Sequence, residues 1–225
     1  MKIFIKFWVV VCFCLPFAGS LGQITKSGQG YLFRYQYVKG KTYRYAMESK
    51  VKNAGMNMNV GLKFKVTVLR VGPKTSKLRY EIDSMTQNGK PIGRSQTAEV
   101  EIDRRGNVVG DAATVQQLGN VAYPQEPIAV GKSWSRKVNS NAMGFRMNLT
   151  GNYKLTGFRK VGSKEYAVLA VSTQNAGDFT INGKGTMLVD RADGMVYDYS
   201  MTMTVGMKTG QQSVQVENVV TIKRQ

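Results

Sequence analysis

The chain has 225 residues, no histidine and two cysteines, Cys12 and Cys14, and it carries 32 Lys and Arg against 14 Asp and Glu. It therefore lacks the side chains of serine–histidine catalysis and of the common zinc and non-haem iron sites, and its only thiols lie near the N-terminus. We expect a protein that is not an enzyme and that needs no cofactor. Its net charge of +18 predicts attraction to anionic surfaces such as lipid head groups or lipopolysaccharide.

The first feature in chain order is a leader segment. Lys2 and Lys6 flank a short stretch that leads into an apolar run from Phe7 to Ala18, and small residues follow. The run is shorter than the ~20 residues that a spanning helix needs. This pattern predicts a signal peptide over residues 1–22 and a periplasmic or secreted mature protein. Export, together with the lack of a nucleic-acid-binding motif, predicts no nucleic acid partner.

The mature chain, residues 23–225, contains an internal repeat. Its copies span about 29–110 and 127–208, and a final strand covers 212–223. Two motifs recur, Gly40-Lys41-Thr42-Tyr43 as Gly131-Lys132-Ser133-Trp134 and Asp103-Arg104 as Asp190-Arg191. Each copy is expected to be one supersecondary unit with an apolar face to bury, so that both copies share a single domain.

Strict alternation of apolar and polar residues predicts long strands. From Met56 to Val68 the even positions are apolar, while most intervening positions are polar. In the second copy the same pattern continues, with Gly151 in place of Leu62 and Gly157 in place of Val68. Glycine in a strand often marks a bend or a close approach of backbone, so we expect any pocket to lie beside these two residues.

Turn signals separate the strands. Hairpin turns are predicted at Asn88-Gly89, Arg105-Gly106-Asn107, Asn182-Gly183 and Asp193-Gly194. One short helix is expected in the connector, from Ala112 to Leu118. Short links without a βαβ rhythm favour antiparallel pairing. The predicted fold class is all-β: a duplicated antiparallel unit forming a barrel-like, half-barrel or two-sheet sandwich arrangement, with the two apolar faces packed together.

The acidic residues favour a structural role. Glu81 and Asp83 share one strand face, and Glu99 and Glu101 share another, each among Lys and Arg neighbours. Cross-strand ion pairs on a solvated face explain this arrangement better than a pair of catalytic carboxylates does. Asp103 and Asp190 each begin a turn and are expected to accept hydrogen bonds from backbone amides there.

Methionine and aromatic residues on the apolar strand faces are the candidate ligand-binding residues. Pliable thioether side chains suit a core, but they also suit an adaptable apolar pocket. A third interpretation is Cu(I) binding by thioethers, which needs no histidine. The candidate binding residues, including the two glycines, are Tyr45, Met56, Met58, Phe64, Met147, Gly151, Tyr153, Gly157, Tyr199, Met201 and Met203.

The chain resembles a family of exported bacterial proteins of unknown function. The resemblance rests on the two Gly-Lys-x-aromatic starts, on the Met/Asn/Thr-rich strands Met56-Asn57-Met58-Asn59 and Met201-Thr202-Met203-Thr204, and on the Pro-containing approach to Trp134. It implies an envelope location and supplies no catalytic residues. A more distant similarity, at the level of fold only, is to periplasmic lipoprotein carriers, whose half-barrel sheet holds acyl chains.

These observations favour a non-enzymatic envelope protein that binds an apolar or amphipathic, lipid-like molecule in a Met- and aromatic-lined interior. The alternative is a structural or interaction protein whose basic surface docks on anionic envelope components. A Cu(I)-handling protein is the third hypothesis.

Overall fold

The computed structural model describes residues 24–53, 56–93, 95–109, 121–142, 145–175, 179–209 and 212–225. The described residues contain strands and no helix, which confirms the predicted all-β class. None of them forms a helix long and apolar enough to cross a membrane. The predicted signal peptide and the predicted helix at 112–118 lie outside the described residues. The strands are β1 (Ile24–Ser27), β2 (Gly30–Phe33), β3 (Thr42–Asn53), β4 (Met56–Val71), β5 (Thr75–Gln87), β6 (Lys90–Pro91), β7 (Gln96–Asp103), β8 (Val108–Val109), β9 (Ser133–Ala142), β10 (Phe145–Val161), β11 (Lys164–Asn175), β12 (Phe179–Asp190), β13 (Val196–Thr209) and β14 (Gln212–Arg224).

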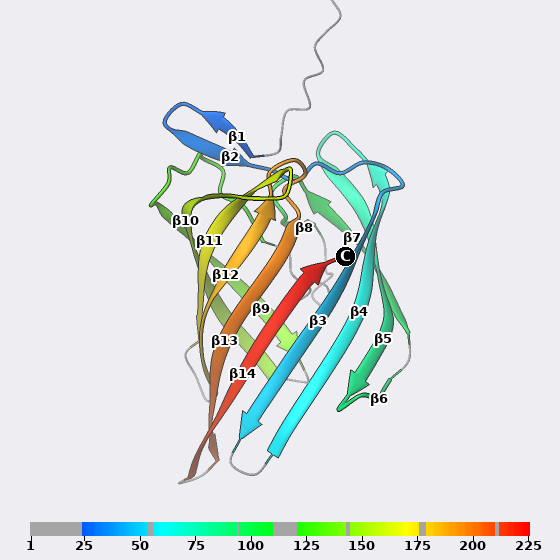
Figure 1. The fold of residues 1–225 in the computed structure, drawn as a ribbon, viewed down its shortest axis with the longest axis vertical. Coiled ribbons are helices and arrows are strands. Elements are labelled where there is room, and N and C mark those ends of the chain that lie inside the picture. The colour runs from blue at the N-terminus through cyan, green and yellow to red at the C-terminus, as the bar shows by residue number, and fades with distance from the viewer. Residues whose placement is uncertain are drawn as a thin grey trace, which may run out of the picture.

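Twelve of these strands form one antiparallel sheet, in the order β8-β7-β5-β4-β3-β14-β13-β12-β11-β10-β9, with β6 paired to β5. Strands β1 and β2 make a separate hairpin. Figure 1 shows the large sheet strongly curved, with the β1–β2 hairpin across one end. Its edges, β8 and β9, are not hydrogen-bonded to each other in the described part of the chain. The sheet is therefore an open half-barrel and not a closed barrel.

Strand β14 joins the two copies of the repeat into this single sheet. The first copy supplies β3 to β8 and the second supplies β9 to β13. Strand β14 pairs with β13, the last strand of the second copy, and with β3, the first strand of the first copy. The two apolar faces consequently do not pack as separate units. They continue into each other as one inner face, because β14 fills the seam between them.

Three of the predicted hairpin turns are confirmed. Asn88 and Gly89 have φ angles of 51° and 78°, and Gly106 and Gly194 have φ angles of 89° and 71°, values that favour glycine or asparagine. The predicted turn at Asn182-Gly183 is wrong, because both residues lie inside β12. A Cβ atom on Gly183 would come within 2.9 Å of the side chains of Met201 and Met203. This glycine makes room for neighbouring methionines.

An aromatic cluster fills one end of the half-barrel. Phe33, Tyr35, Tyr37 and Tyr123 are all at least 93% buried, and none of them belongs to the large sheet. Phe33 ends β2, and the three tyrosines lie in loop segments. The Tyr35 ring lies 4.9 Å from Tyr123 and 5.5 Å from Tyr37, between centroids. Strand β2 ends at Phe33, before Tyr35 and Tyr37. We call these four residues the aromatic plug and this end of the sheet the plugged end.

The connector between the copies spans the gap between the two sheet edges at the plugged end. Tyr123 exchanges hydrogen bonds with Arg105, which follows β7, through the Tyr123 amide (2.7 Å) and the Arg105 Nε (3.1 Å). On the other side the Trp134 indole, from β9, donates to the carbonyl of Ala122 at 3.2 Å. Tyr35 holds the same segment, since its hydroxyl donates to the Val121 carbonyl at 2.9 Å. Residues 121–123 thus close this end of the half-barrel.

Candidate binding site on the inner face

Strand register aligns the inner-face residues in rows that run across the sheet. One row crosses eight strands from β5 to β10, next to the buried pair Tyr45 and Phe64, and most of its side chains are buried. Its residues are Met85, Leu62, Met47, Ile222, Tyr199, Met187, Leu169 and Leu155. This first inner row is continuous with the plug, because all of its members belong to or pack against the same hydrophobic cluster.

Burial decreases in the next two rows, towards the end of the sheet where the long hairpins turn. The second inner row consists of Gln87, Val60, Ser49, Val220, Met201, Gly185, Val171, Tyr153 and Trp134. The third inner row consists of Met58, Val51, Asn218, Met203, Gly183, Thr173, Gly151 and Arg136. In the second row Met201 and Val171 are buried, whereas in the third row only the two glycines are.

Every non-glycine residue of the third row is half-buried. Met58, Val51 and Met203 therefore present apolar surface on the same face that is densely packed two rows away. We call the second and third inner rows together the hairpin-end surface. Its third-row side chains, the glycines apart, keep part of their surface exposed.

The structure brings several predicted binding residues to this surface. Met58, Gly151, Tyr153, Met201 and Met203 belong to it, and Tyr199 lies in the adjoining first row. Tyr45 and Phe64 do not: they stack on each other at 5.1 Å inside the buried core. The side chains of Met56 and Met147 lie outside the part of the chain whose side chains are described.

The two glycines differ from the expectation. Gly151 leaves no gap, because the ring and hydroxyl of Tyr153 lie 3.1–3.3 Å from the position that a Cβ would take. Gly157 does not match Val68. In β4 the strand pairing shifts at a bulge after Val68, and in β10 it shifts at a bulge after Leu155. Gly157 is the first paired residue after its bulge, so it corresponds to Arg70 of the first copy. It lies towards the plugged end, and no atom lies within 4 Å of the position that its Cβ would take.

Two methionine sulfurs of the hairpin-end surface accept hydrogen bonds. The Met201 sulfur accepts from the Tyr199 hydroxyl at 2.9 Å and from the Thr173 hydroxyl at 3.7 Å. The Met58 sulfur accepts from the Gln87 amide at 3.1 Å. These hydrogen bonds fix the two thioethers as parts of an apolar surface that carries a few polar groups. They favour that role over copper ligation.

Carboxylates on the outer face of the first copy form the predicted cross-strand ion pairs. Glu99 pairs with Lys77 at 2.6 Å and with Arg79 at 2.8 Å, and Lys65 lies 3.5 Å from both Glu81 and Asp83. Hydrogen bonds from Lys77 first and Arg79 second lower the pKa of Glu99. These acids are held by basic neighbours on a solvated face.

The predicted turn roles of the two matched aspartates are confirmed. Asp103 accepts hydrogen bonds from the amides of Arg105 (2.8 Å) and Asn107 (2.9 Å), and Asp190 accepts from the amide of Ala192 at 3.0 Å.

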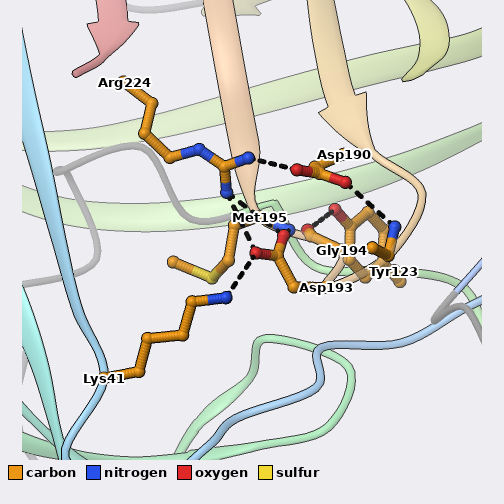
Figure 2. A network of polar contacts seen from close by, with 8 residues as sticks. Lys41, Tyr123, Asp190, Asp193, Gly194, Met195 and Arg224 are labelled. Atoms are coloured by element: carbon orange, nitrogen blue, oxygen red, sulfur yellow. Dashed lines mark hydrogen bonds and ion pairs between the residues drawn. The ribbon is translucent and has the colours of Figure 1, made fainter. Parts of the chain in front are cut away.

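Asp190 has a second role in a buried charge network that the sequence did not reveal (Figure 2). The Arg224 guanidinium, near the end of β14, pairs with Asp190 and also with Asp193 at 3.1 Å. Lys41 reaches Asp193 from the other copy at 3.3 Å. Burial acts to lower the pKa of Arg224, but Asp193 and the other neighbours outweigh it and raise that pKa. The network locks β14 to both copies beside the plug.

The outer face of the second copy carries a polar furrow of about 470 Å³ across β11, β12 and β13. Its outer-face lining residues are Ser172, Gln174, Asn182, Lys184, Thr202 and Thr204, of which Lys184 is the cation. Thr173 and Gly183 of the third inner row also line it. This furrow lies on the opposite side of the sheet from the methionines of β13, since Thr202 and Thr204 alternate with Met201 and Met203.

One polar residue of the hairpin-end surface, Arg136, was not among the predicted site residues. It belongs to β9 and pairs with Gly151 of β10. The signal for it was present, because Arg136 is two residues from Trp134 and alternation places both on one face. Basic residues of strands were instead expected to face solvent.

Comparisons with known proteins add no assignment: neither a family model nor a curated protein matches the chain.

Proposed function

We propose that this protein is a non-enzymatic carrier or binding protein of the cell envelope that holds an amphipathic, lipid-like molecule on the hairpin-end surface. The observation that supports this proposal is the gradient of burial along the inner face. Apolar side chains that are closely packed in the first row become half-buried in the third, without a change of face. An acyl chain laid along Met58 and Met203 would complete their burial.

Two further features agree with a binding role. The charged groups of the plugged end are engaged in structural contacts: Asp103 and Asp190 in turns, Arg224 in its buried network. The chain also contains no histidine, and its leader segment is typical of export. The plug and the connector make one end of the half-barrel rigid, so the ligand would enter from the hairpin end.

A pair of neighbouring substitutions on β13 tests this proposal. Met203→Asp places a carboxylate on the inner face, whereas Thr202→Asp places one on the exposed outer face of the same strand. We expect Met203→Asp to weaken binding of pyrene-labelled palmitate about tenfold, because the acyl chain would have to desolvate a charge. Thr202→Asp should leave the affinity within about twofold.

Fluorescence titration of both variants, with thermal melts to establish that they fold, gives the result. If the wild-type protein binds no acyl probe, the proposed lipid-binding function is wrong. Selective weakening by Thr202→Asp would instead favour the alternative role, in which the outer furrow with Lys184 docks on an anionic envelope component.

A further inference from the structure

Arg136 is the charged residue of the second and third inner rows, whose other polar members, Gln87, Ser49, Asn218 and Thr173, are neutral. Register pairs it with Gly151, and Trp134, two residues earlier on the same strand face, packs on the core through Phe33 and Tyr153. Arg136 is half-buried. Along the third row its neighbours lead from Gly151 and Thr173 towards Met203 and Met58. The Arg136 guanidinium therefore lies at the β9 edge of the hairpin-end surface, and the other end of the third row, at Met58, is apolar.

Within the described part of the chain, the Arg136 guanidinium has no hydrogen bond and no ion pair. The contrast with Arg224 is informative, because that second inward-facing arginine is bound by both Asp190 and Asp193. A guanidinium carries five donors, and partial burial without an acceptor costs free energy. Desolvation lowers the pKa of Arg136, with Tyr153 acting in the opposite direction.

Tyr153 supplies a second donor at the same place. Its ring stacks on Trp134 at 5.3 Å, and its hydroxyl lies 3.1 Å from where a Cβ of Gly151 would be, directly across from Arg136. Burial raises the pKa of Tyr153, so its hydroxyl stays protonated and can donate. The absence of a side chain at Gly151 permits this position of the ring. Arg136 and the Tyr153 hydroxyl thus both lie beside Gly151, where the inner face meets the β9 edge.

We propose that the bound amphiphile is anionic and that Arg136 binds its carboxylate or phosphate head group, with the Tyr153 hydroxyl as a second donor and the acyl chain along Met203 and Met58. This inference rests on the proposed function and narrows it to one class of ligand. A planar guanidinium matches both kinds of head group through paired N–H donors, and charge-assisted bonds of this kind are the strong ones. Fatty acids and lysophosphatidates present such head groups, whereas monoacylglycerols do not.

The test compares Arg136→Gln with Lys137→Gln, which removes the adjacent exposed cation from the outer face of β9. Palmitate, palmitoyl lysophosphatidate and neutral monopalmitoylglycerol are titrated against each protein by displacement of a pyrene-labelled acyl probe. Wild-type protein should favour at least one anionic ligand over the neutral one by about tenfold. Arg136→Gln should abolish that preference and leave the affinity for monopalmitoylglycerol unchanged, which also reports that the surface is intact.

Lys137→Gln should behave as wild type. The tighter of the two anionic ligands identifies a carboxylate or a phosphate as the head group. Equal wild-type affinity for anionic and neutral ligands, or equal losses in the two variants, would overturn the inference while leaving the proposed function standing. Failure of all three ligands to bind would overturn the proposed function itself.

Discussion

Replacing Arg224 by methionine is expected to lower the free energy of unfolding by about 3–5 kcal/mol, because the change leaves Asp190 as a buried carboxylate without its cation and leaves Asp193 with Lys41 alone. The side chains of Arg224 and Asp193 are each 10% exposed and that of Asp190 is 4% exposed, so water cannot take over this role. Methionine keeps the length and apolar contacts of the stem, which isolates the effect of the charge.

The matched control is Arg79→Met, which breaks the ion pair with Glu99 on the outer face. There the side chains are 42% and 33% exposed, and exposed pairs contribute only about 0–1 kcal/mol. Urea denaturation of both variants measures the difference. Similar small losses in the two proteins would mean that the network does not hold β14 between the copies.

The second large effect is a loss of stability at alkaline pH. Burial raises the pKa of Tyr35, Tyr37, Tyr45 and Tyr123 above the ordinary value in the folded protein. In the unfolded chain these hydroxyls ionise near pH 10. The unfolded state therefore releases protons that the folded state retains, and stability falls as the pH rises above about 10. With about 1.4 kcal/mol per tyrosine for each pH unit, these four residues contribute about 5 kcal/mol per pH unit. Tyr43 and Tyr199, whose pKa values burial also raises, add to that slope.

Denaturation curves between neutral and alkaline pH, with tyrosinate absorbance as a second signal, measure this effect. Tyr37→Phe should reduce the slope by about 1.4 kcal/mol per pH unit, which is one tyrosine's share. It should cost little at neutral pH, because the Tyr37 hydroxyl is buried and has no hydrogen-bond partner in the described chain. A tyrosinate signal near pH 10 that is present in the folded wild-type protein and missing from Tyr37→Phe would contradict a sealed aromatic plug.

Local patterns predicted much of this fold. Alternation located the long strands, and the turn roles of Asp103 and Asp190 followed from their positions, because both depend on contacts between close neighbours in sequence. The joining of the copies by β14 is a long-range pairing between β3 and the last strand, and alternation carries no information on which strands become neighbours. The half-barrel was accordingly one of three predicted arrangements.

The site was predicted less completely for two physical reasons. Aligning the two copies by their sequence offset does not reveal the bulges after Val68 and Leu155. Each bulge changes which residues correspond between the two copies. Asn182-Gly183 has the composition of a turn, but glycine in β12 serves the packing of Met201 and Met203. Arg136 was not predicted as a site residue because basic strand residues usually face water. An inward-facing cation can be recognised only when the orientation of its strand is known.

The position of a bound acyl chain tests the central claim most directly. Palmitate carrying a diazirine at its apolar end can be photo-crosslinked to the wild-type protein, and the modified residues can be read by peptide mass spectrometry. Crosslinks at Met58, Val51 or Met203 on the inner face are the predicted result. Crosslinks confined to the outer furrow, at Thr202, Thr204 or Lys184, would contradict it.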